Sequence, residues 1–131
     1  MTEWRFLDRA IILAVHEEQL AQHGGGVGLR DGGLLESALA RPENLAAYNP
    51  DADAAALAAA YAFGIAKNHP FIEGNKRTAF VAMELFLMDN GYLLTASDED
   101  ALMTMLRLAA GEMGEETYAD WVRLKTDELG S

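Results

Sequence analysis

Apolar residues recur at steps of three and four along most of the chain, which is the spacing of one face of an α-helix. Leu7, Ile11 and Val15 show this spacing within a first predicted helix over residues 4–22. No stretch alternates strictly, and only residues 92–94 are expected to be extended. The pattern therefore predicts an all-α fold, with further helices over residues 34–40, 54–67, 75–90, 97–110 and 117–129.

Capping residues and helix breakers mark the ends of several predicted helices. Asp31 precedes the second helix and Pro42 is expected to end it, so residues 43–53 are predicted to form an irregular linker. Asp51 or Asp53 is expected to cap the third helix, because a side-chain oxygen at that place accepts a hydrogen bond from the first turn.

Two of the predicted helices differ from the others in composition. Residues 54–67 are mostly alanine, so small side chains cover nearly every face and neighbouring helices can pack closely around them. Residues 79–88 are apolar nearly all round, which is typical of a buried core helix. Glu84 interrupts this segment, and we expect it at a solvent gap or in an ion pair rather than in catalysis.

The composition narrows the class of protein. Residues 1–131 are enough for one domain, and half of them are hydrophobic. The 21 acidic residues outnumber the 10 basic ones, which argues against binding to nucleic acid and leaves docking on a basic partner open. The absence of cysteine, of a visible signal peptide and of a long apolar span predicts a cytoplasmic protein without a membrane segment.

Two other features have ordinary explanations at this level. His16 and His23 lie seven residues apart and could share a helix face as metal ligands, but with few acidic neighbours they are better explained as ordinary polar positions. The glycine-rich residues 24–33 lack the preceding strand and the Gly-Lys-Ser/Thr ending of a phosphate loop. A flexible or tightly turned connection is the favoured interpretation.

The most reactive stretch, residues 69–77, lies between the two apolar helices. Because a residue before proline avoids the helical region, His69 should end the helix before Pro70 and be displayed on a loop. Imidazole titrates near pH ~6.5, so neutral His69 can accept a proton from an attacking hydroxyl. The alternative is a histidine that only caps the helix end.

The residues after His69 suit a phosphate-bearing ligand. Glu73 is a hard oxygen donor of the kind that Mg²⁺ uses beside phosphates, although a surface carboxylate is the alternative. Gly74 permits close approach of the backbone, and Asn75 is expected to cap the next helix and leave its N–H groups free for an anion. Lys76 and Arg77 are unfavourable at a helix N-terminus unless an anion is present.

These nine residues resemble the Fic/Doc signature His-x-Phe-x-Asp/Glu-Gly-Asn-x-Arg. Lys76 stands where Fic adenylyltransferases have a second glycine, which is similar to the death-on-curing (Doc) branch of the family. Other Doc-like stretches are residues 23–25, 28–31, 33–42 and 90–92. The resemblance implies a Fic/Doc-type helical bundle with the motif loop at the N-terminus of a buried central helix.

The resemblance also implies a toxin of a type II toxin–antitoxin pair, which uses ATP to phosphorylate a threonine of elongation factor Tu. By motif position, His69 would be the base and Glu73 the Mg²⁺ ligand, and the phosphates would be cradled by Gly74, Asn75, Lys76 and Arg77. Lys76 favours phosphate transfer, because it fills space and adds charge where glycine would let the phosphates run deep. Glu73 and Gly74 are closer to the Fic pattern, so adenylyl transfer is one alternative and a non-catalytic partner-binding module is another.

An inhibitory Ser/Thr-x-x-x-Glu-Gly/Asn motif would indicate control within the same chain. Residues 95–99 have its spacing, but Asp100 follows where Gly or Asn is needed. The expected partner is therefore a Phd-like antitoxin supplied in trans, with a segment that folds as a helix into an apolar groove.

Overall fold

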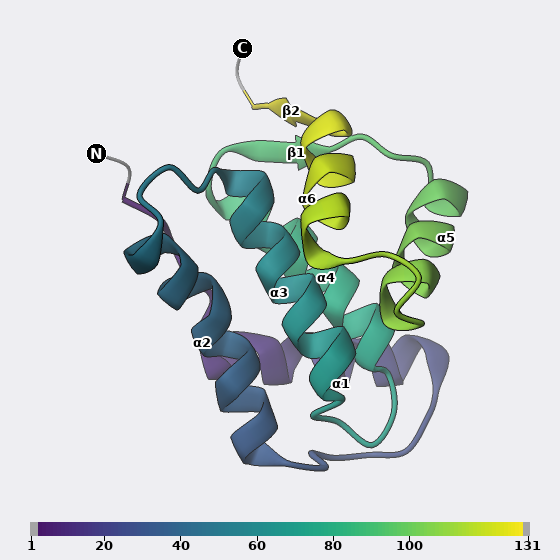
Figure 1. Cartoon of the computed structure of the whole chain (residues 1–131). Helices are drawn as coiled ribbons and strands as arrows, with labels where there is room; N and C mark the ends of the chain where they lie inside the picture. Colours follow the sequence, from purple (N-terminus) through teal and green to yellow (C-terminus); the bar gives the residue numbers. More distant parts are fainter. Residues whose placement is uncertain (1–2, 130–131) are drawn as a thin grey trace.

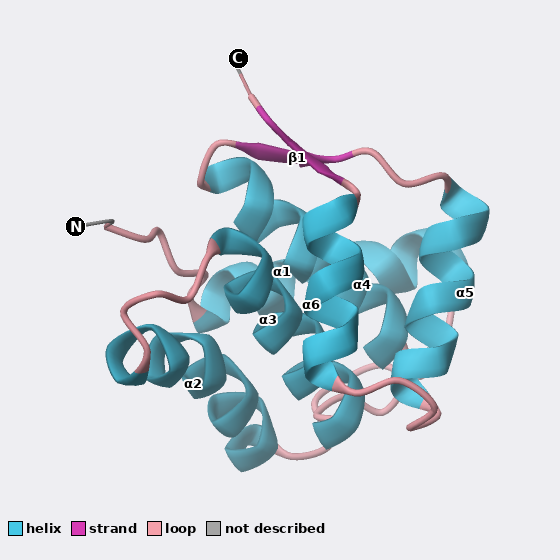
Figure 2. Ribbon diagram, turned by 45° about the horizontal axis from the view of Figure 1, so that its top comes forward, coloured by secondary structure: helices cyan, strands magenta, loops and turns pink. Residues whose placement is uncertain are grey.

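Helices dominate the computed structural model, which describes residues 3–129. Within this range the helices lie around one central pair, and a short two-stranded antiparallel sheet lies at one end (Figures 1 and 2). The all-α prediction is confirmed. The elements are α1 (Arg9–His23), α2 (Gly32–Tyr48), α3 (Ala54–Asn68), α4 (Asn75–Asp89), β1 (Tyr92–Leu94), α5 (Asp98–Ala109), α6 (Glu115–Leu124) and β2 (Thr126–Glu128).

The alanine-rich helix α3 lies at the centre and packs against α2, α4, α5 and α6 (Figure 1). Its small side chains let these helices approach from several directions. At Gly64, a Cβ atom would lie 3.2 Å from both Cα and O of Ala38 in α2, so a larger residue would push the two helices apart. The expected close packing around residues 54–67 is confirmed.

Helix α4 forms the second half of the core. It packs against α3 and α1, and its inner face is fully buried at Ala82, Met83, Phe86 and Leu87. The ring of Phe86 lies 5.3 Å from that of Tyr61 in α3, measured between centroids. The predicted core helix is therefore confirmed, and its N-terminal end leads directly into the motif loop.

The first helix begins later than its apolar period suggested. Asp8 caps α1 by accepting a hydrogen bond from the Ile11 N–H at 2.9 Å, so the chain before it is not helical. Trp4 and Phe6 precede the helix and place their rings 6.1 and 6.0 Å from that of Phe86. Both side chains thus pack against the core from the non-helical segment before α1.

The prediction that Pro42 ends the second helix was wrong. Helix α2 continues through buried Pro42 to Tyr48, so residues 43–48 are not an irregular linker. Proline removes one hydrogen bond from the helix, but Leu45 and Ala46 beyond it pack against the core. This tertiary packing outweighs the local helix-breaking preference.

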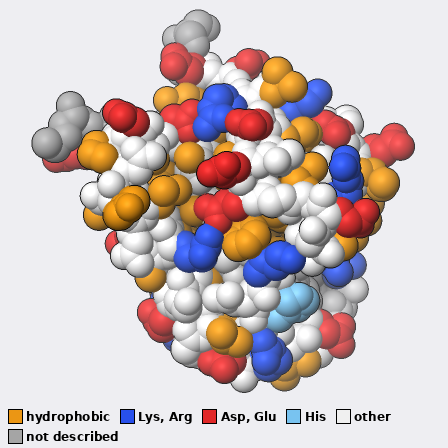
Figure 3. Space-filling view, viewed as in Figure 1, with side chains coloured by type: hydrophobic (Ala, Val, Ile, Leu, Met, Phe, Trp, Pro, Cys, Tyr) orange, Lys and Arg blue, Asp and Glu red, His pale blue; other side chains and the backbone are white. Residues whose placement is uncertain are grey.

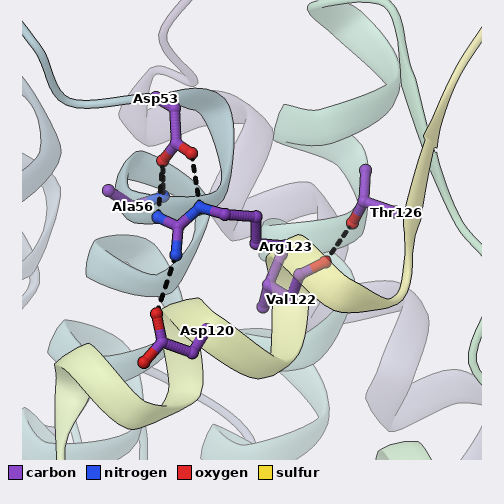
Figure 4. A network of polar contacts seen from close by, with 6 residues as sticks. All are labelled: Asp53, Ala56, Asp120, Val122, Arg123 and Thr126. Atoms are coloured by element: carbon purple, nitrogen blue, oxygen red, sulfur yellow. Dashed lines mark hydrogen bonds and ion pairs between the residues drawn. The ribbon is translucent and has the colours of Figure 1, made fainter.

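The last predicted helix was too long. Helix α6 ends at Leu124, and residues 126–128 pair with β1 in the register Tyr92–Glu128, Leu93–Asp127 and Leu94–Thr126 (Figure 2). The Thr126 hydroxyl donates to the Val122 carbonyl at 2.5 Å, next to the point where the helix stops (Figure 4). Pairing with the backbone of β1 replaces the last helical turn.

None of the helices within residues 3–129 combines the length and the apolarity that a membrane crossing requires.

Asp53 joins the start of α3 to α6 (Figure 4). Its carboxylate accepts a capping hydrogen bond from the Ala56 N–H at 2.9 Å and two from the guanidinium of Arg123, at 2.6 and 2.9 Å. Hydrogen bonding to Arg123 holds the pKa of the Asp53 carboxyl below its usual range, against the opposing effect of partial burial. The prediction that Asp51 or Asp53 caps this helix is confirmed for Asp53.

Replacing Asp53 should separate its two roles. We expect Asp53→Ala to lower the free energy of unfolding by about 1–2 kcal/mol, because cap and ion pair are both lost. Asp53→Asn keeps a capping oxygen and should cost less than about 1 kcal/mol, since the exposed pair with Arg123 contributes little. Urea denaturation measures both; equal losses would show that capping is not the main contribution.

Glu84 lies half-buried on α4, and its side chain has no ion pair or hydrogen bond within the described residues. Of the two expected settings, the ion pair is therefore not found. Burial raises the pKa of the Glu84 carboxyl, and the Asp98 carboxylate raises it further. Folding thus favours the protonated form, so ionised Glu84 destabilises the protein.

Glu84→Gln should raise the melting temperature at pH 7, where the unfolded state has this carboxylate ionised and burial disfavours that form. The gain should shrink as the pH falls through the unfolded-state pKa of about 4.3 and vanish well below it, because the carboxyl is then protonated in both states. Thermal denaturation across this pH range tests this, with exposed Glu17→Gln as the control that removes one charge from an acidic chain. Equal gains for the two variants would attribute the effect to net charge alone.

Candidate active site

The loop between α3 and α4 has a left-handed residue at each end. His69 ends α3 with φ 49° and ψ 55°, and Gly74 begins α4 with φ 82°. Among the described residues, His69 is the one non-glycine residue with positive φ. Because such a conformation is unfavourable for a bulky side chain, the surrounding structure must impose it. As predicted, His69 ends the helix and is exposed on the loop.

Asn75 fixes the inside of this loop. Its buried side-chain amide accepts a hydrogen bond from the Phe71 N–H and donates one to the Phe71 carbonyl, both at 2.9 Å. The same nitrogen lies 3.5 Å from Nδ1 of His69. Asn75 is therefore not the helix cap that the sequence suggested; Gly74 takes that place, and no side chain caps α4.

The N-terminal turn of α4 is open to a ligand. The backbone N–H groups of Asn75, Lys76 and Arg77 have no acceptor within residues 3–129. The Lys76 and Arg77 side chains are exposed and have no acidic partner in the same part of the chain. Free N–H groups, the positive end of the helix dipole and two cations together form a binding site for an anion.

A cavity of about 570 Å³ adjoins this turn, which is within the size range of small-molecule sites. Its polar end consists of residues 73–77. The rest is mostly apolar and comes from α4 and α5, with Phe80, Asp98, Ala101, Leu102, Met105 and Leu106. His69 lies outside this lining and is linked to it by the contact with Asn75.

The α5 wall of the cavity was not predicted. The sequence predicted a helix over these residues but did not connect them with the site. Leu102 and Leu106 line the cavity and are exposed, at 59% and 41% of their full accessible area. The signal that could have identified them is an excess of leucine and methionine on a helix that also carries a buried face.

Glu73 is the single carboxylate on the motif loop, and it borders the polar end of the cavity. No group of three or more His, Asp or Glu side chains suited to a metal occurs in the described part of the chain. Magnesium needs no such group, since it binds through one or two carboxylates together with water and substrate phosphates. The donor set therefore fits Mg²⁺ held jointly by Glu73 and a nucleotide.

The glycine-rich segment before α2 supports the motif loop from outside. Arg30 donates from its guanidinium to the carbonyls of His69 and Asn68, at 2.7 and 2.8 Å, and from its backbone N–H to the Pro70 carbonyl at 2.7 Å. The Ile72 N–H donates to the Gly28 carbonyl at 3.2 Å. Residues 24–33 are thus a tight connection that holds the active-site loop.

The role of Arg30 was missed, although its cation at the C-terminal end of α3 is electrostatically favourable.

Basic side chains recur on the surface near a histidine. Figure 3 shows several Lys and Arg side chains around a surface histidine in the lower half of the view, with acidic side chains scattered over the rest of that face. A chain with formal charge −11 therefore still presents local positive charge to an anionic ligand.

Removing the Asn75 amide should damage the loop. Asn75→Ala leaves the buried N–H and C=O of Phe71 without partners, so we expect a loss of about 2–4 kcal/mol in the free energy of unfolding. Lys76→Ala, at the next and exposed position, should change it by no more than about 0.5 kcal/mol. Urea denaturation of both variants measures this; similar values for the two would show that the Asn75 contacts are not stabilising.

Comparison with known proteins identifies the family of this chain. Residues 6–87 match the family described as the Fic/DOC family. The chain is 33% identical over 112 residues to "Protein kinase doc" of Escherichia phage P1, which covers 86% of this chain and 88% of that protein. It is 41% identical over 98 residues to "Toxin Doc" of Mycolicibacterium smegmatis, covering 73% and 71%. This chain therefore belongs to the Fic/Doc family, and within it to the Doc branch.

Proposed function

We propose that this protein is a Doc-like toxin that transfers the γ-phosphate of ATP to a protein hydroxyl. The observation that carries the proposal is the open first turn of α4, where three N–H groups lie beside the cations Lys76 and Arg77, none of them with a partner within residues 3–129. The two relatives, named as a protein kinase and as a toxin, support a protein-modifying enzyme of this kind.

The phosphates would lie at the start of α4, and the rest of the nucleotide in the adjoining cavity. The N–H groups of Asn75, Lys76 and Arg77 would donate hydrogen bonds to phosphate oxygens, and Gly74 would let the ligand approach the backbone. The apolar side chains of Phe80 and Met105 offer a surface for a flat base. This division matches the polar and apolar ends of the cavity.

His69 would act as the general base. It takes the proton of the acceptor hydroxyl as that oxygen bonds to the γ-phosphorus, and the bond to the β,γ-bridging oxygen breaks to release ADP. Such transfer depends mainly on placing the hydroxyl in line with the leaving oxygen. The left-handed conformation and the hydrogen bond from Arg30 fix the His69 backbone, and the contact with Asn75 links its imidazole to a residue that lines the cavity.

Glu73 would hold Mg²⁺ together with phosphate oxygens, and the ion when bound neutralises phosphate charge. Lys76 would decide which phosphate faces His69. Its side chain occupies the space at the helix start that a glycine would leave free, which favours the γ-phosphate over the α-phosphate at the base. Transfer of AMP is the second candidate activity, and the Glu73–Gly74 pair favours it.

The proposed substrate is elongation factor Tu, modified on a threonine. This modification would take place in the cytoplasm and would stop translation. A Phd-like antitoxin in trans is the proposed inhibitor. The exposed Leu102, Met103 and Leu106 of α5 support a partner helix on that side, since such a patch of apolar residues is suited to helix-in-groove binding.

Incubation with elongation factor Tu and ATP labelled at either the γ- or the α-phosphate tests the proposal. We expect γ-label on threonine, and a rate about 10²–10⁴-fold lower in His69→Ala. Transfer of α-label would contradict the kinase assignment and establish adenylyl transfer. Lys76→Gly should shift label from γ towards α if Lys76 sets the orientation of ATP.

Growth arrest on expression provides the control for a non-catalytic role. Arrest by the wild type that is lost in His69→Ala agrees with an enzyme. Arrest that persists unchanged in His69→Ala, without transfer of either label, would instead support a module that sequesters its partner.

A further inference from the structure

His16 is a buried histidine that contacts the motif loop. It lies on α1, is 3% exposed, and stacks on Phe71 of the motif loop with ring centroids 3.8 Å apart and planes 9° from parallel. Its Nε2 lies 2.8 Å from the carbonyl oxygen of Glu73. Because a carbonyl oxygen only accepts hydrogen bonds, Nε2 carries the proton and donates it.

The stacking and the hydrogen bond of His16 both go to the motif loop. Its Cδ2 and Nε2 would each lie 3.6 Å from a Cβ atom at Gly74, so the ring also borders the residue that begins α4. His16 therefore hydrogen-bonds the Glu73 carbonyl and lies next to Gly74.

The Glu73 side chain is held from another direction. A Cβ atom at Gly25 would lie 2.9 Å from Glu73 Oε2, and one at Gly26 would lie 3.3 Å from Oε1. Both carboxylate oxygens therefore lie against a stretch of backbone that has no side chains. Any larger residue at Gly25 would have to displace the carboxylate, and φ +128° at Gly25 already disfavours one.

We propose that His16 is a positioning residue, which together with the Gly25–Gly26 backbone fixes the backbone and the carboxylate of Glu73 for a divalent cation. The conformational part, that His16 fixes the Glu73–Gly74 backbone, stands on the contacts alone. The cation part rests on the proposed function. Partners that orient a ligand residue typically change metal affinity about 10–100-fold when they are removed, although they never touch the metal.

Two substitutions separate the ring from its hydrogen bond. His16→Phe keeps an aromatic ring against Phe71 and removes the donor, whereas His16→Gln keeps an amide donor of similar reach and removes the stacking. We expect His16→Phe to shift the backbone ¹H–¹⁵N resonances of Glu73, Gly74 and Asn75, and His16→Gln to restore them in large part. Unchanged resonances in a folded His16→Phe protein would overturn the conformational part.

Calorimetric titration with ATP, with and without Mg²⁺, tests the cation part on the whole chain. In His16→Phe we expect ATP affinity without Mg²⁺ to change less than about 2-fold, and the gain from Mg²⁺ to fall about 10-fold. His16→Gln should recover most of that gain. An unaltered Mg²⁺ response in His16→Phe would make His16 a core residue only. If the wild type binds no ATP, the proposed function fails, while the resonance shifts still decide the conformational part.

A second pair of variants keeps the test open if His16→Phe does not fold. Gly25→Ala and Gly24→Ala both place a methyl group on a residue with positive φ, but only the first meets Glu73, since nothing lies within 4 Å of a Cβ at Gly24. We expect Gly25→Ala to weaken the Mg²⁺ response about 10-fold and Gly24→Ala to leave it unchanged. Equal effects, or none at Gly25, would contradict a role of this backbone in holding Glu73.

Discussion

A central helix with almost no side-chain bulk is the constraint on which this fold depends. Helix α3 meets four other helices, and its alanines and Gly64 set how closely each can approach. Close-packed interiors respond to changes of a single methyl group, so this helix tolerates little enlargement. Its position also fixes where it ends, and so where His69 lies relative to α4. Core packing and site geometry are thus set by the same helix.

The motif loop takes its shape from contacts that others make with its backbone. The Asn75 amide hydrogen-bonds the backbone of Phe71, and the Arg30 guanidinium hydrogen-bonds the carbonyl of His69. The His16 ring hydrogen-bonds the carbonyl of Glu73. The left-handed backbone of His69, which is not a glycine, is stable only in such surroundings. A site shaped in this way is largely formed before a ligand arrives, so binding requires little ordering of the loop.

Local signals made much of this predictable, and long-range contacts account for what was missed. The caps Asp31 and Asp53 act within one helical turn, and the sequence therefore identified them correctly. The end of α2 depends on the packing of Leu45 and Ala46 against the core, and the end of α6 depends on pairing with β1, so neither could be predicted from local preference. The motif correctly indicated that its last residues lie at the start of α4. The capping role expected of Asn75 was wrong.

The residues that hold the motif loop from outside share one further property: His16, Gly28 and Arg30 all precede it in the chain, whereas the α5 wall of the cavity follows it. On a ribosome, all of these contacts to the motif loop become available once α4 has emerged. The cavity beside the loop is completed only when α5 packs. For a protein proposed to arrest translation, this order would postpone a complete ligand pocket until α5 has been synthesised.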